Sequence, residues 1–346
     1  MVREKLKVGI VIPTYKKELW YKFVTAWNWE SDKYYLNLYI VEDNPKKSFL
    51  DLPKPLGSIY INHYCWKDID KDLKDKAWII SRKSSAIRSY GYYKAYQDGC
   101  EYVLTIDDDC YPEKEDYNKI EQLIFNHKAF AMDLHHEYSN TYNVGKQLFP
   151  TSGNLWMRGS PIRYRKGRGA LVSVGGWNNN PDLDAWTQLE NQEPKLKVEP
   201  SVKNVPKYSG VTMCGMNVLF HRSVIPIAYF LLQGVAWGVD RVDDIWAGLF
   251  IKKVLDVYDK PMAINGFASI NHERASNAFV SLKKEGLTLL ETELLWDRLI
   301  PLKLDNTCPL KTYNSLAEQL QPEWLGTKEY GLKLKEAMKI WVGLFR

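Results

Sequence analysis

The sequence has few of the features that mark a membrane protein, a disulfide-stabilised protein or a zinc protein. Among its 346 residues there is no stretch of 18 apolar residues, which a transmembrane helix needs. The five cysteines are odd in number and widely spaced, and no Cys-x-x-Cys pair occurs, so neither a disulfide framework nor a structural zinc site is indicated. The N-terminal apolar run is too short for a signal peptide. These absences predict a cytoplasmic protein with reduced cysteines.

The chain also has little net charge. A formal charge of +5 is too small and too evenly spread to predict a nucleic-acid partner, although it suits an anionic small ligand. Hydrophobic residues at 45% and charged residues at 26% are typical of a soluble globular protein. The length allows one large domain or two ordinary ones.

What the sequence does contain is a series of short apolar runs that end in polar residues. Residues 8–15 and 37–44 are predicted to be buried parallel strands, and residues 17–29 between them a helix. A helix over residues 83–99 then leads into a strand over 101–109. This order predicts an α/β protein with a doubly wound nucleotide-binding sheet, which binds ligands at the carboxyl ends of its strands.

The remaining elements are read from weaker patterns. The region 138–206 is rich in glycine, asparagine and proline and is predicted to be a long functional loop. The predicted elements around it are a helix over 112–126, a strand over 127–136, a strand pair or bulged strand over 210–222, a helix over 242–258, an apolar run ending at His272, and two helices after residue 311.

Three consecutive aspartates, Asp107, Asp108 and Asp109, follow the predicted strand in the stretch VLTIDDDC. Carboxylate oxygens are the ligands that Mg²⁺ and Mn²⁺ prefer. In an extended chain, Asp107 and Asp109 point to one side and Asp108 to the other. A solvated turn that caps a helix is the alternative. The buried strand upstream and the other strands that end in acids favour a metal site.

A glycine-punctuated loop, MRGSPIRYRKGRG, carries Arg158, Arg163 and Arg165. Guanidinium groups bind phosphate oxygens in a bidentate manner, and glycine lets a ligand approach the backbone. A solvated basic loop is one alternative. A nucleic-acid patch is another, but no recognised binding motif accompanies the charge. We therefore interpret the loop as a site for a diphosphate opposite a metal ion.

Two further groups are candidates for the site. Asp243 and Asp244 open a predicted helix, where they either stabilise its N-terminus or, as adjacent carboxylates with separated pKa values, transfer protons. His272 ends an apolar run. It is either structural or a third ligand of a carboxylate-bound ion.

Several motifs, in order, resemble one family. The stretches are YVLTIDDDC, RGSPIRYRKG, NNPDLDAWTQL, TMCGMNVLFHR and RVDDIWAG. Together they resemble the reversibly glycosylated polypeptides, which are UDP-arabinopyranose mutases. The resemblance runs from about Val8 to Glu285 and fades beyond residue 287. It implies a GT-A type glycosyltransferase fold, with a mixed, mainly parallel sheet flanked by helices over residues 1–300 and a C-terminal helical extension over 301–346.

The resemblance also implies a UDP-sugar substrate and a Mn²⁺ or Mg²⁺ cofactor. Asp107 and Asp109 would hold the metal, with Asp107 shared with the ribose. The resemblance also places Glu42 or Asp43 near the uridine and Arg88 near the nucleotide. Asp108 would hold the turn, and Arg158 would bind the phosphates. The arginine that is glycosylated in the family corresponds to Arg165, and Arg163 lies two residues before it.

The resulting hypothesis is an enzyme that interconverts the pyranose and furanose forms of a UDP-pentose, with possible reversible self-glycosylation on Arg165. Asp243 or Asp244 would serve as its base. One alternative is a glycosyltransferase that moves the sugar to an external acceptor. Another is a self-glycosylating UDP-sugar-binding scaffold. Homo- or hetero-oligomers remain open.

Overall fold

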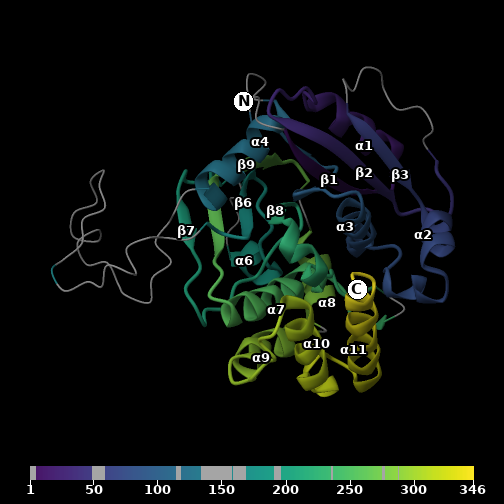
Figure 1. The fold of residues 1–346 in the computed structure, drawn as a ribbon, viewed down its shortest axis with the longest axis vertical. Coiled ribbons are helices and arrows are strands. Elements are labelled where there is room, and N and C mark those ends of the chain that lie inside the picture. The colour runs from purple at the N-terminus through teal and green to yellow at the C-terminus, as the bar shows by residue number, and fades with distance from the viewer. Residues whose placement is uncertain are drawn as a thin grey trace.

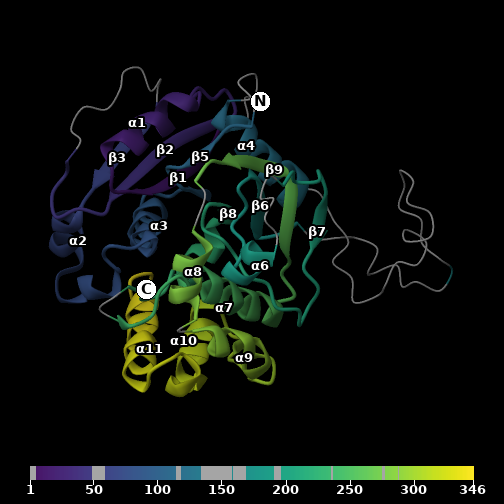
Figure 2. The ribbon, with the colours of Figure 1, turned by 180° about the vertical axis from the view of Figure 1, so that it is seen from behind.

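In its described part, the chain forms an α/β fold around one curled sheet of nine strands (Figures 1 and 2). This computed structural model describes residues 5–48, 59–113, 118–133, 158, 169–190, 196–234, 237–274, 277–286 and 288–346. The strand order is β3-β2-β1-β4-β8-β6-β9-β5, and β7 pairs with β9. The predicted α/β class and mixed sheet are therefore confirmed.

The strands lie where apolar residues alternate or run together. Their bounds are β1 Leu6–Thr14, β2 Tyr34–Glu42, β3 Tyr60–Tyr64, β4 Tyr102–Ile106, β5 Cys110–Tyr111, β6 Val172–Asn179, β7 Val202–Asn204, β8 Asn217–His221 and β9 Met262–His272. Strands β1 to β4 pair in parallel, as does β6 with β9. The other four pairings are antiparallel, so parallel pairing dominates only the N-terminal half of the sheet.

Helices cover both faces of this sheet. Their bounds are α1 Lys17–Ala26, α2 Trp66–Leu73, α3 Arg88–Gln97, α4 Ile120–His127, α6 Ala185–Glu190, α7 Asp243–Val257, α8 Ala278–Glu285, α9 Leu289–Leu299, α10 Pro309–Gln319 and α11 Lys328–Gly343, with short 3₁₀ turns η1 Lys74–Ile79, η2 Ser85–Ile87, η6 Arg222–Ile227 and η8 Pro322–Trp324. None of the helices in the described part of the chain is long and apolar enough to cross a membrane.

Strand β1 divides the hydrophobic core into two layers. Val8, Ile10 and Ile12 pack into the cluster that contains Trp20 of α1. Val11 packs into the larger cluster with α3. This alternation follows from the two-residue period of a strand. At Gly91, an added Cβ would lie 2.5 Å from a methyl group of Val11, so glycine lets α3 lie close to the sheet.

Two sequence predictions are wrong. Residues 127–136 were expected to form a strand, but α4 reaches His127 and a π-helix, η4, continues over Lys128–Asp133. His127 is fully buried and forms hydrogen bonds with Ser173 and Asn217, which fixes the helix end against the sheet.

The expected loop over 138–206 contains β6, α6 and β7 in its described part. In β6, Gly175 lies against Asn217 and the carbonyl of Ala268, so the glycine that weakens the strand pattern is there for close packing.

The last helices pack on the rest of the fold (Figure 1). Trp341 of α11 stacks on Tyr229 with ring centroids 5.2 Å apart. Tyr330 donates a hydrogen bond to the carbonyl of Leu232 over 2.6 Å. The two predicted C-terminal helices are thus confirmed, and their apolar residues join the larger core cluster. The division of the chain at residue 300 stays a prediction.

Candidate functional site

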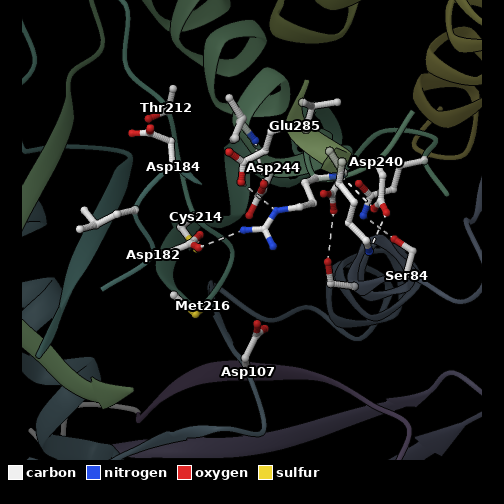
Figure 3. Close-up of a pocket in the computed structure, with 18 of the residues that line it drawn as sticks. Ser84, Asp107, Asp182, Asp184, Thr212, Cys214, Met216, Asp240, Asp244 and Glu285 are labelled. Atoms are coloured by element: carbon white, nitrogen blue, oxygen red, sulfur yellow. Dashed lines mark hydrogen bonds and ion pairs between the residues drawn. The ribbon is translucent and has the colours of Figure 1, made fainter. Parts of the chain in front are cut away.

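A cavity of about 1320 Å³ opens at the carboxyl ends of β1, β2 and β4, where the sequence predicts a ligand site. Its walls are formed by the residues after these strands, the start of α3, the first turn of α7, the end of β9, and helices α6, α8 and α9. Figure 3 shows Asp107 entering the cavity from the sheet, opposite Asp182 and Asp244. Segments far apart in the sequence therefore meet around one space.

Asp107 is paired with Arg88 in the cavity wall. Arg88 is 2% exposed, and its Nη2 lies 2.6 Å from Asp107 Oδ1. The rest of the guanidinium donates to the carbonyl of Ser85 over 2.9 Å and to Thr105 Oγ1 over 3.0 Å. One buried cation thus connects the start of α3 with the end of β4.

Asp108 has a partner of its own at the end of β1. Thr14 Oγ1, at the end of β1, donates to Asp108 Oδ2 over 2.6 Å. Burial raises the pKa of Asp108 to about 7, although the bond from Thr14 works in the opposite direction. Asp108 therefore joins the ends of two neighbouring strands.

Asp109 faces His272 and Arg274. The pairing of β5 with β9 places Cys110 opposite His272, which is how a residue 163 positions away reaches the aspartates. Asp109 Oδ2 lies 3.7 Å from His272 Nε2 and 3.3 Å from Arg274 Nε. Burial opposes ionisation of Asp109, but these two neighbours outweigh it and hold the pKa below its usual value.

The donor atoms around the aspartates fit a divalent ion in their chemistry. His272 Nδ1 donates to the carbonyl of Asn180 over 2.6 Å; burial lowers the pKa of the imidazole, but the Asp109 carboxylate beside Nε2 outweighs it and raises that pKa above its usual value. Nε2 is buried and has no hydrogen-bond partner. A histidine that ligates a metal typically donates its other N–H in this way. Among the described residues, no three acidic, histidine or cysteine side chains are gathered as a complete metal cluster.

The two acids of α7 lie in the same cavity. Asp243 is 3% exposed, and burial followed by the charge of Asp244 raises its pKa well above the usual value. Asp244 Oδ2 accepts from the backbone N–H of Gly215 over 2.9 Å. Burial raises the pKa of Asp244 to about 6. Both carboxyls therefore line the cavity with raised pKa values.

The two acids that end β2 differ in position. Glu42 is fully buried and does not line the cavity; its carboxylate is held by His63 and by Ser48. Asp43 lines the cavity. The arginine loop lies mostly outside the described residues. This holds for Arg163 and Arg165, whereas Arg158 is described and is an exposed turn residue.

A second charged group in the cavity escaped the sequence analysis. Arg241 has a left-handed backbone, with φ of 64°, and its guanidinium lies 3.2 Å from Glu285 and 3.7 Å from Asp182. Cys214 Sγ donates to Asp182 over 3.1 Å. Asp182 lies in the stretch NNPDLDAWTQL, and Arg241 lies in RVDDIWAG. Nothing in the spacing of the two stretches indicates that they come together in the fold.

The described cavity wall carries far more acids than bases. Eleven carboxylates line it, against five lysine or arginine side chains. An anionic ligand would be repelled from such a space unless further cations accompany it.

Removing Arg88 is predicted to destabilise the protein strongly, because Asp107 would lose its buried partner. We expect Arg88→Met to lower the free energy of unfolding by about 3–5 kcal/mol. The matched control is Arg82→Met: Arg82 pairs with Asp70 over 2.8 Å at the surface, and its loss should cost no more than about 1 kcal/mol. Urea unfolding of the two variants measures both values. Equal losses would contradict the role given to the buried pair.

The comparisons with known proteins cover nearly the whole chain. Residues 3–346 match the family model described as reversibly glycosylated polypeptide. The chain is 33% identical to a protein named probable UDP-arabinopyranose mutase 2 from Solanum tuberosum, over 98% of this chain and 89% of that protein. It is also 33% identical to UDP-arabinopyranose mutase 1 from Oryza sativa subsp. japonica, over 98% and 90%.

Solved structures are more distant. A mycobacterial protein is 9% identical with a TM-score of 0.42, over 84% of this chain and 74% of that one. Glucosyl-3-phosphoglycerate synthase from Mycobacterium tuberculosis, in complex with Mn²⁺, uridine diphosphate and phosphoglyceric acid, is 9% identical with a TM-score of 0.40, over 86% and 80%. On the family model and the sequence relatives, the chain belongs to the reversibly glycosylated polypeptide family.

Proposed function

We propose that the chain is a GT-A type UDP-sugar mutase, which interconverts the pyranose and furanose forms of a UDP-pentose such as UDP-arabinose. The observation that carries the proposal is the 33% identity, over 98% of the chain, to proteins named UDP-arabinopyranose mutase. The cavity supports it, because about 1320 Å³ exceeds the roughly 300–1,000 Å³ of usual small-ligand pockets. A nucleotide and a sugar that must open and reclose therefore have room.

We propose that Asp107, Asp109 and His272 hold a Mn²⁺ or Mg²⁺ ion. The surplus of carboxylates supports this, since a diphosphate needs cations to enter the cavity. His272 supports it as well, because its Nε2 makes no hydrogen bond and lies 3.7 Å from Asp109 Oδ2. When bound, such an ion neutralises charge on the departing diphosphate. Arg274 lies beside Asp109 with an exposed side chain, so it is free to turn to phosphate oxygens.

The chain's own residues then position and shield the substrate. Asp43 and the start of α3 would receive the nucleoside, and Arg88 keeps the end of β4 in place. The arginine loop with Arg158 and Arg163 would face the diphosphate. We further propose Arg165 as the acceptor of reversible glycosylation. A guanidinium is a poor nucleophile because its pKa is above about 12, so this step needs a carboxylate base.

Asp244 and Asp243 are the proposed proton-transfer groups. Reclosure of the sugar ring through a different hydroxyl requires that hydroxyl to lose its proton and the former ring oxygen to gain one. Asp244 lines the cavity, and its pKa of about 6 lies near neutral pH, as an efficient general base requires.

Turnover tests the proposal directly. Purified protein mixed with Mn²⁺ and UDP-arabinopyranose is expected to generate the furanose form, which NMR resolves by its ring signals. Sugar that appears on an added glycan acceptor, without any furanose nucleotide, would instead indicate a transferase. Absence of interconversion with every UDP-pentose tried would refute the mutase.

The fall of activity at low pH should reflect protonation of Asp244. A base with a pKa of about 6 is ionised above that pH and protonated below it, so kcat should fall as the pH drops through about 6. Asp244→Asn should lower kcat by about 100-fold or more and remove that fall. Asp297→Asn on the exposed side of α9 is the control and should leave the profile unchanged. A variant Asp244→Asn that keeps the fall at low pH would rule the residue out.

A further inference from the structure

Asp182 presents an open carboxylate to the cavity. Its side chain is 40% exposed, and the residue lines the cavity in the segment between β6 and α6. Figure 3 shows it beside Cys214, across the cavity from Asp107. A ligand that fills the cavity can therefore reach the carboxylate of Asp182.

Two partners hold this carboxylate without saturating it. The guanidinium of Arg241 lies 3.7 Å from Asp182 Oδ1, which is too long for a hydrogen bond. Cys214 Sγ donates to Oδ2 over 3.1 Å, and a thiol is a weak donor. Because a carboxylate accepts about four hydrogen bonds in all, Asp182 keeps the capacity to accept from donors on a ligand.

The wall that carries Asp182 is fixed by other contacts. Asp184 caps α6, since its carboxylate accepts from the N–H of Thr187 over 2.9 Å and from the Thr187 hydroxyl over 2.6 Å. Glu285 of α8 accepts from the first N–H of α6 over 2.8 Å and lies 3.2 Å from the guanidinium of Arg241. Arg241 would thus keep a carboxylate partner if Asp182 were replaced.

An aromatic ring belongs to the same wall. Trp186 lines the cavity and is 64% exposed. Its Nε1 donates to Glu190 over 2.8 Å, which restrains the indole. An exposed aromatic surface and an open carboxylate in one wall suit a sugar, because the C–H groups of a sugar ring pack on an aromatic face and its hydroxyls donate to a carboxylate.

The charge of Asp182 indicates which part of a UDP-sugar it would meet. A carboxylate repels a diphosphate, which is proposed to lie with cations at Asp107 and Asp109 on the facing wall. Sugar hydroxyls are neutral donors and form a charge-assisted hydrogen bond with a carboxylate. A mutase must also keep the sugar in the cavity after its bond to UDP breaks, so the sugar needs contacts of its own.

We propose that Asp182 accepts hydrogen bonds from hydroxyl groups of the pentose and so binds the sugar part of the substrate. This inference rests on the proposed function. UDP alone gains nothing from Asp182 and is repelled by its charge, whereas a UDP-sugar also gains the hydrogen bonds of its hydroxyls. Neutralising Asp182 therefore acts in opposite directions on the two ligands.

The test measures how well UDP and UDP-arabinopyranose each displace radiolabelled UDP from the protein with Mn²⁺ present. Asp182→Asn should weaken UDP-arabinopyranose about 10-fold and leave UDP as tight as in wild type or slightly tighter. Asp182→Ala should change the ratio of the two affinities at least as much. Asp184→Asn is the matched control. It removes one negative charge from the same wall and keeps a good helix cap, so it should leave the ratio unchanged.

Three results would overturn the inference. Equal weakening of both ligands by Asp182→Asn would assign the residue to the nucleotide or to packing. Equal tightening of both would reduce it to a source of charge. The same change of ratio in Asp184→Asn would show that the effect is not specific to Asp182. Wild-type protein that binds no UDP and shows no turnover would refute the proposed function itself, which is a separate result. Circular dichroism confirms that each variant is folded.

Discussion

The crowding of carboxylates at one edge of the sheet is the constraint on which the rest of the site depends. Three aspartates in succession repel one another, and the fold gives each a different partner: Arg88 for Asp107, Thr14 for Asp108, and His272 with Arg274 for Asp109. These partners come from α3, β1 and the end of β9. Balancing the charge of one short turn therefore brings together elements from most of the chain.

The same constraint explains how the cavity would work. A space lined by many carboxylates attracts cations and repels a diphosphate. Cations shared between the wall and the ligand turn that repulsion into binding. Burial raises the pKa values of both acids of α7, and Asp243, whose pKa lies well above its usual value, adds little negative charge near neutral pH. The residues proposed to hold a metal and those proposed to move protons are thus distinct, although they line one cavity.

Much of this was predictable from the sequence, and the limits are physical. Apolar runs that end in polar residues located β1, β2 and β4 and the ligand edge, because buried parallel strands have a strong pattern. Asp109 and His272 were predicted to share a metal ion, without any indication of how they come together. The pairing of β5 with β9 brings them together, and no local sequence pattern predicts such a long-range pairing. Arg241 with Glu285, and Asp182 with Cys214, escaped for the same reason. The prediction of a strand over residues 127–136 was wrong because a short apolar run fits a strand as well as a buried helix.

The central claim is that cations at the aspartate cluster admit a UDP-sugar to this cavity. Calorimetric titration of UDP into the metal-stripped protein, with and without Mn²⁺, tests it most directly. The account predicts tight binding with Mn²⁺, binding at least about 10-fold weaker without it, and loss of the Mn²⁺ effect in Asp109→Asn. Binding of UDP that is equally tight with and without the ion would contradict the account.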